Sequence, residues 1–128
     1  MAARILYYKK MEKPHLIILF GSRARETASK QSDADIAVLA DHSLSLEEKS
    51  NTAFELAQKL KISEDCIDLV DLWNAPPLLQ KQVADEGKLL EGDEFDFLRF
   101  RVLAWKRYQD TAKFRRARER ALANAYDK

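Results

Sequence analysis

Cysteine is almost absent from this chain of 128 residues, in which Cys66 stands alone. A single cysteine cannot close an intramolecular disulfide and offers no zinc-ligand spacing, so a disulfide-stapled fold is excluded and a cytoplasmic location is expected. Long apolar runs are missing as well: no stretch approaches the roughly 18 apolar residues of a membrane span. The residues after Met1 also lack the apolar segment of a signal peptide.

An excess of charge of one sign is also lacking, since the formal net charge is only +1. The apolar share of 46% and the charged share of 34% are typical of a soluble globular protein. A chain of this length makes about one domain, so we expect a single domain over 1–128. Its core is modest, and little room remains for a second domain that would bind an acceptor substrate.

Glycine and proline are scarce, with three of each, and they punctuate a regular alternation of elements. Apolar, β-branched runs predict buried strands over 15–20, 33–40 and 66–73, with a short edge strand over 88–91. Helices are predicted over 2–11, 22–28, 46–60 and 76–86, followed by one long basic C-terminal helix over 94–126. This order predicts an α/β fold with a small β-sheet flanked by helices.

Gly21-Ser22 follows the first strand directly. Glycine has no Cβ and lets a phosphate approach the backbone closely, and the serine adds a hydroxyl. A helix that begins here would point free N–H groups at the same spot, which favours an anion. Taken alone, the pair is equally consistent with an ordinary turn.

Asp33 and Asp35 open the second predicted strand and point to the same face of it. Two carboxylates about 5 Å apart repel by roughly 3 kcal/mol at an effective dielectric near 20. A divalent cation would remove that cost, and hard oxygen ligands on a strand suit Mg²⁺. An acidic loop that leads into a strand is the simpler alternative, but it does not explain why Asp35 adjoins the apolar run 36–39.

A third carboxylate is expected from a neighbouring strand, where Asp68 lies within the apolar run. Asp71 points to the opposite face and Asp65 lies in the preceding turn, so both are interpreted as solvated surface. Two metal ions held by three carboxylates can bridge the attacking oxygen, an α-phosphate and a leaving pyrophosphate. The pattern therefore predicts phosphoryl-group transfer, achieved mainly by positioning and charge neutralisation.

Gly21-Ser22, ten residues, then Asp33-Ala34-Asp35 resembles the signature of the DNA polymerase β-like nucleotidyltransferase superfamily. The strings Gly-Ser-Arg-Ala-Arg and Ile67-Asp68-Leu69-Val70-Asp71-Leu72 resemble its minimal nucleotidyltransferase branch, as does 85–90 leading into a long helix. The likeness spans about residues 15–110 and is closest to the MntA antitoxins of HEPN/MNT toxin–antitoxin pairs. It implies a small mixed sheet.

Members of that branch transfer AMP from ATP to a tyrosine of a partner HEPN ribonuclease toxin and silence it. The resemblance implies that Asp33 and Asp35 bind two Mg²⁺ ions and that Asp68 binds the catalytic one and helps to activate the hydroxyl. Gly21 and Ser22 would hold the triphosphate of ATP. Glu26 departs from the family, which usually has glycine there; a left-handed backbone would cost it about 1 kcal/mol.

Basic residues cluster in two places. Arg23, Arg25 and Lys30 surround the predicted triphosphate site, and Arg25 is our candidate for neutralising it, although each singly also fits solvated surface. The segment 99–120 holds nine Lys or Arg and two acids. Its first half is expected to cover the sheet with Leu98, Val102 and Trp105, while the half after Thr111 reaches a partner or solvent.

Three functions stay open on the sequence. The first is an antitoxin enzyme in a hetero-oligomer with its toxin. The second is a transferase acting on a small molecule such as an antibiotic, for which the short chain leaves little acceptor pocket. The third is a non-catalytic binder that masks a toxin, against which the intact Asp33, Asp35 and Asp68 argue. Neither direct nucleic-acid binding nor membrane association is expected.

Overall fold

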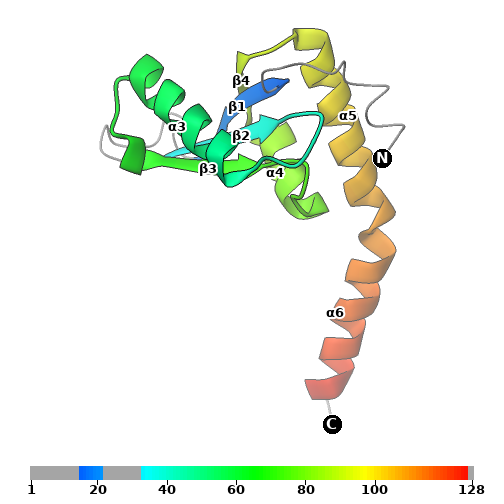
Figure 1. The fold of residues 1–128 in the computed structure, drawn as a ribbon. Helices are drawn as coiled ribbons and strands as arrows, with labels where there is room; N and C mark the ends of the chain where they lie inside the picture. The colour runs from blue at the N-terminus through cyan, green and yellow to red at the C-terminus, as the bar shows by residue number, and fades with distance from the viewer. Residues whose placement is uncertain (1–14, 22–32, 127–128) are drawn as a thin grey trace.

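Four strands form one mixed sheet in the order β3-β2-β1-β4 (Figure 1). The structure is a computed structural model that describes residues 15–21 and 33–126, so the helices predicted over 2–11 and 22–28 lie outside the described residues. The strands match the predicted runs to within one or two residues at each end. They are β1 (Leu16–Phe20), β2 (Ala34–Leu39), β3 (Ile67–Asp71) and β4 (Lys88–Glu91).

Strand directions confirm the mixed sheet. The central strand β1 pairs antiparallel with β2, from Leu16 opposite Leu39 to Phe20 opposite Asp35, and antiparallel with β4 on its other side. Strand β3 instead runs parallel to β2. A parallel neighbour requires a crossover, and the helix α3 (Leu46–Leu60) supplies it. The starts of β2 and β3 therefore lie at the same end of the sheet as the end of β1.

Alternation along the strands divides the core between two faces of the sheet. On one face α3 packs Leu56 against Ile17, Ile36 and Val38. The other face, which holds Leu16, Ile18 and Phe20, is covered by α4 (Pro77–Glu86) and α5 (Glu94–Asp110). Figure 1 shows α3 and α4 on opposite sides of the strands.

Helix α3 begins where its capping signals predict. The Ser45 hydroxyl accepts a hydrogen bond from Glu48 N at 3.1 Å, and Glu48 Oε1 accepts one from Ser45 N at 3.1 Å. This reciprocal capping box satisfies two of the backbone N–H groups that a helix start leaves unpaired. The helix ends at Lys61, which adopts φ +56° and closes the last turn.

Helix α4 is tied to its neighbours by the buried Gln80. Its amide nitrogen donates to the carbonyls of Leu72 at 3.2 Å and Ala75 at 3.0 Å, and its Oε1 accepts from Arg107 of α5 at 3.1 Å. The helix stops as predicted at Gly87, whose N–H donates to Val83 O at 2.8 Å. Because the donor and acceptor atoms of the buried Gln80 side chain are all hydrogen-bonded, this residue fixes the relative position of β3, α4 and α5.

The long helix predicted over 94–126 is present but bent, because it is interrupted at Thr111 and so divides into α5 and α6 (Ala112–Tyr126). No proline or glycine causes the break. The Thr111 hydroxyl donates to Tyr108 O at 2.8 Å, and Arg115 donates to the same carbonyl at 2.8 Å while its guanidinium lies 3.7 Å from the Tyr108 ring centre. Side-chain donors thus compete for a carbonyl that the helix would otherwise use, which bends it.

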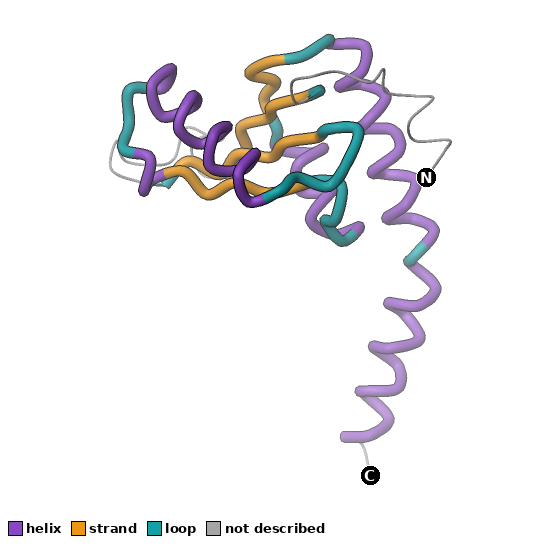
Figure 2. The backbone as a smooth tube through the Cα atoms, in the orientation of Figure 1, coloured by secondary structure: helices purple, strands orange, loops and turns teal. Residues whose placement is uncertain are grey.

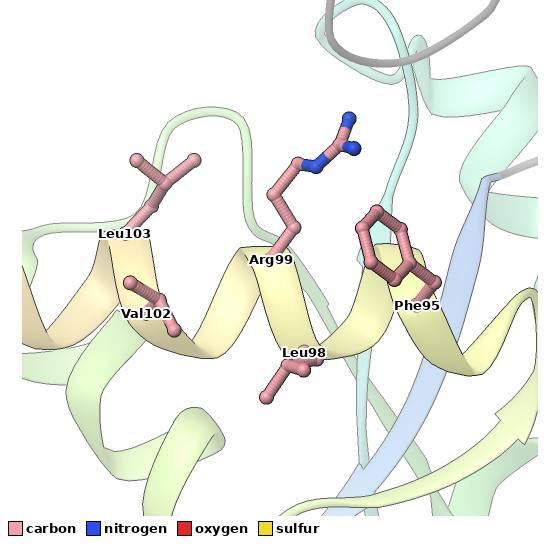
Figure 3. Close-up of a pocket in the computed structure, with 5 residues that line it drawn as sticks. All are labelled: Phe95, Leu98, Arg99, Val102 and Leu103. Atoms are coloured by element: carbon pink, nitrogen blue, oxygen red, sulfur yellow. The ribbon is translucent and has the colours of Figure 1, made fainter.

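Helix α5 also turns a different side toward the sheet from the one that the sequence predicts. Phe100 and Ala104 are the buried residues, with Phe97 and Trp105 packed beside them, whereas Leu98 and Val102 are each 51% exposed. Of the three residues expected to cover the sheet, only Trp105 does so. The two others line a pocket on the helix surface (Figure 3) together with Phe95, Arg99 and Leu103.

Within the described ranges, no helix is both long and apolar enough to cross a bilayer.

Candidate active site

Parallel pairing places Asp35 and Asp68 directly side by side on neighbouring strands. Paired strands lie about 4.8 Å apart, so the two side chains leave the same face at that spacing. It is the face that carries Ala37 and Val70, on which the larger apolar cluster lies. The third strand therefore supplies a carboxylate next to Asp35, as the sequence predicts, and Asp68 itself is exposed to solvent.

Gly21 lies against the same pair. It follows β1, whose last residue Phe20 is opposite Asp35, and it has φ +73°, a conformation that L side chains rarely adopt. A Cβ built on Gly21 would lie 2.2 Å from Asp35 Oδ2, well inside contact distance. The absence of a side chain at Gly21 is therefore what leaves the Asp35 carboxylate its space.

Asp33 precedes β2 by one residue and is exposed, and its position two residues before Asp35 directs it to the same face. Within 15–21 and 33–126, no three His, Cys, Asp or Glu side chains are arranged to hold a metal ion on their own. The structure thus brings Asp33, Asp35 and Asp68 to one end of the sheet without closing a three-ligand cage. The other predicted site residues, Ser22 and Arg25, lie outside the described residues, as does Glu26.

Asp71 is not the solvated surface residue that was expected. It is half-buried and accepts hydrogen bonds from Leu44 N and Trp73 N, both at 3.0 Å. It also accepts from Ser43 Oγ and from Asn74 Nδ2, each at 3.2 Å. The bond to the N–H two residues on is an Asx turn, for which an aspartate at a strand end is the sequence signal. Asp71 therefore fixes the β2–α3 connection to the end of β3.

Both histidines lie at the end of the sheet away from Gly21, and both pair with carboxylates. The buried His15 places Nε2 2.8 Å from Asp96 Oδ2 and so ties the start of β1 to α5. His42 lies between Asp41 and Glu48, with ring nitrogens at 2.6 and 2.7 Å from their carboxylates. The Asp41 hydrogen bond, and then that of Glu48, raises the pKa of His42 above its usual 6.5.

Residues 5–95 match the model of the family described as polymerase beta, nucleotidyltransferase. The chain belongs to this nucleotidyltransferase family. Two relatives are named protein adenylyltransferase MntA. The one from Shewanella oneidensis is 43% identical over 82% of this chain and 73% of its own length. The one from Aphanizomenon flos-aquae is 39% identical over 69% of this chain and 65% of its own length.

Solved nucleotidyltransferase structures share the fold. A toxin–antitoxin solved with AMP-PNP superposes with a TM-score of 0.72 at 34% identity, covering 95% of this chain and 94% of its own. A tri-AMPylated Shewanella oneidensis HEPN toxin in complex with MNT antitoxin gives a TM-score of 0.67 at 34% identity, over 88% and 86%. The family fold is thus the one that places Asp35 beside Asp68.

Proposed function

We propose that this nucleotidyltransferase is an antitoxin that transfers AMP from ATP to a tyrosine of a partner HEPN ribonuclease toxin and thereby neutralises it. The observation that best supports this proposal is the Asp35–Asp68 pair beside Gly21. The chain is also related to proteins that are named protein adenylyltransferase. A protein acceptor also suits a chain in which each face of a four-stranded sheet is already covered by helices.

The carboxylates at this end of the sheet fit Mg²⁺. Asp33, Asp35 and Asp68 offer only oxygen donors, which this hard cation prefers, and phosphate oxygens would complete its coordination. Because Gly21 has no Cβ, the Asp35 carboxylate can lie directly against the backbone that follows β1. Asp33 and Asp35 would hold two ions and Asp68 would share the catalytic one. Bound there, Mg²⁺ would supply neutralisation of the charge that develops on the phosphates.

The chain's own residues position the two reactants. Gly21, Ser22 and Arg25 would hold the triphosphate tail, with Gly21 allowing close backbone approach. The tyrosine oxygen then forms a bond to the α-phosphorus, the bond from that phosphorus to the bridging oxygen of the β-phosphate breaks, and pyrophosphate leaves with the electron pair. The phenolic proton passes to the Asp68 carboxylate. Asp68, exposed at the start of the edge strand β3, is accessible to an incoming protein side chain.

Intact-mass measurement of the toxin tests this function. The chain is co-expressed with the toxin of its genomic neighbourhood, in wild-type form and as Asp33→Ala/Asp35→Ala. Added AMP on the toxin that disappears with the double variant is the expected result. An unmodified toxin that still binds tightly would indicate masking by contact, and AMP transfer to a small molecule with none to the toxin would indicate an antibiotic-type transferase; either outcome overturns the proposal.

A further inference from the structure

Helix α6 extends away from the rest of the protein. Figures 1 and 2 show it continuing past the end of α5 and away from the sheet and the other helices. Beyond Arg115, every residue of it up to Ala125 is exposed. The large apolar side chains Phe114 and Leu122 are 74% and 54% exposed. The helix therefore buries almost nothing against its own domain.

A helix of 15 residues gains little stability by itself, since isolated helices of that length are marginal in water. Most helices in proteins are stabilised by packing an apolar face, and α6 has no such packing within the described residues. Phe114 and Leu122 add exposed apolar surface to a helix that its own domain does not stabilise, and burial of that surface against a partner would stabilise it.

The charge of α6 identifies the chemistry of that partner. The helix holds five Lys or Arg and a single acid, Glu119, whereas the remaining residues of the chain hold 17 cations and 20 carboxylates. A net charge of +1 thus conceals a basic helix attached to an acidic domain. A surface that complements α6 must carry an excess of carboxylates or other anions.

Three of the five cations of α6 lie on a different side from its large apolar residues. At about 100° per residue, Lys113, Arg116 and Arg120 share one side, and Arg116 and Arg120 line a common surface pocket with Ala123. Phe114 and Leu122 lie on another side of the helix, together with Ala121, Ala125 and Arg118. Phosphate contacts would use only the basic side, whereas a protein surface uses both, with an apolar centre and a charged rim.

The direction of α6 is fixed by the contacts at its first turn. Arg115 turns back onto α5, where it donates to Tyr108 O at 2.8 Å and to Thr111 Oγ1 at 2.5 Å. Lys81 of α4 lies 5.1 Å from the same Tyr108 ring centre. The junction therefore holds α6 in one orientation, which lowers the ordering cost of binding with it.

We propose that α6 is a docking arm that binds an acidic surface of the partner toxin, an inference that rests on the proposed function. Pairing of α6 with the α6 of a second copy does not fit, because it would bring two strongly basic segments together. The arm extends away from the sheet past the end of α5 (Figure 1), so it holds the toxin without entering the chemistry.

The test compares the charge-reversed Arg116→Glu/Arg120→Glu with Lys49→Glu/Lys106→Glu, which makes the same change in net charge on α3 and α5. Toxin affinity is measured by calorimetry, and AMP transfer by intact mass at varied toxin concentration. We expect the α6 variant to bind about tenfold more weakly and to raise KM for the toxin by a similar factor. Its kcat stays within about twofold of wild type, because the transfer site is unchanged.

Control and wild type should agree in Kd, KM and circular dichroism. Equal toxin affinity for wild type and the α6 variant would overturn the docking arm. So would α6-dependent binding of a short RNA that leaves toxin affinity unchanged, or an α6-dependent dimer of this chain in light scattering. If wild type transfers no AMP, the proposed function fails, yet the two affinities still decide the docking arm.

Discussion

The backbone of Gly21 lies so close to the carboxylate of Asp35 that a Cβ on residue 21 would be 2.2 Å from Asp35 Oδ2. Gly21→Ala should therefore displace this carboxylate and strain a backbone at φ +73°. We expect AMP transfer to fall roughly 100-fold, since a shift of about 1 Å in a reacting group has that effect. The strained backbone should cost about 1–2 kcal/mol of stability, measurable by urea denaturation.

The matched control is Gly92→Ala. Gly92 also has a positive φ, +126°, and its added Cβ would lie 2.7 Å from His15 O, at the opposite end of β1. It should lose comparable stability but keep AMP transfer per folded molecule. Equal loss of transfer in both variants would show that Gly21 matters only for folding.

Asp35 and Asp68 should repel each other when no cation is present. At about 5 Å and an effective dielectric near 20 the repulsion is about 3 kcal/mol, which solvent exposure of Asp68 reduces to about 1 kcal/mol. Asp68→Asn should therefore raise the free energy of unfolding in EDTA by about that amount while abolishing AMP transfer. Mg²⁺ with AMP-PNP should raise the Tm of wild type more than that of the variant. A variant as responsive to Mg²⁺ as wild type contradicts the metal-ligand role.

Asp71→Ala should destabilise the protein without touching the chemistry. The change leaves the N–H groups of Leu44 and Trp73 without their acceptor, which should cost about 2–3 kcal/mol. Urea denaturation measures the loss, and AMP transfer per folded molecule should stay at the wild-type level. Asp65→Ala, at an exposed position only six residues away, should change stability by less than about 0.5 kcal/mol.

His42 predicts a pH dependence of stability. Its folded pKa is raised by the Asp41 and Glu48 carboxylates, so the folded state binds the proton more tightly than the unfolded chain, whose pKa is 6.5. The stabilisation is fully present below pH 6.5 and is lost as the pH rises through the folded pKa. Wild type should therefore exceed His42→Asn in stability more at about pH 6 than at about pH 9. NMR titration should place the His42 pKa above 6.5; a lower value contradicts the pairing.

Phe100→Ala and Leu98→Ala distinguish the two sides of α5. Phe100 is 4% exposed and its truncation should cost about 3–5 kcal/mol, whereas Leu98 is half exposed and should cost about 1 kcal/mol or less. Chemical denaturation of both variants measures the difference. Equal losses would place the two side chains in comparable surroundings and contradict the observed rotation of the helix.

The strands and α3 could be predicted from the sequence because their signals are local. Apolar β-branched runs mark β1 and β2, and Ser45 with Glu48 marks the start of α3. The sequence also predicts that Asp35 and Asp68 lie near each other, because Asp68 is expected on a strand that neighbours the strand of Asp35. Their register, with the two residues opposite each other, depends on the parallel pairing of β2 with β3 and had to come from the structure.

The C-terminal region was harder because its signals are not local. Helix α5 carries large apolar residues on every side, so more than one of its faces could cover the sheet; contacts of Phe97, Phe100 and Ala104 with distant strands decide the rotation. The break at Thr111 arises from side-chain donors on Thr111 and Arg115 that reach one carbonyl, a feature that residue types alone do not mark.

Strand β3 lies at the edge of the sheet, with its outer backbone groups unpaired within the described residues. Such an edge is a template on which another chain can add a strand, and natural proteins protect edges with charge. Asp68 interrupts an otherwise apolar stretch from Ile67 to Val70 at this position. We therefore expect the residue proposed to bind metal also to limit edge-to-edge association of this strand. Variants that neutralise it gain stability in dilute solution but become more prone to self-association as their concentration rises.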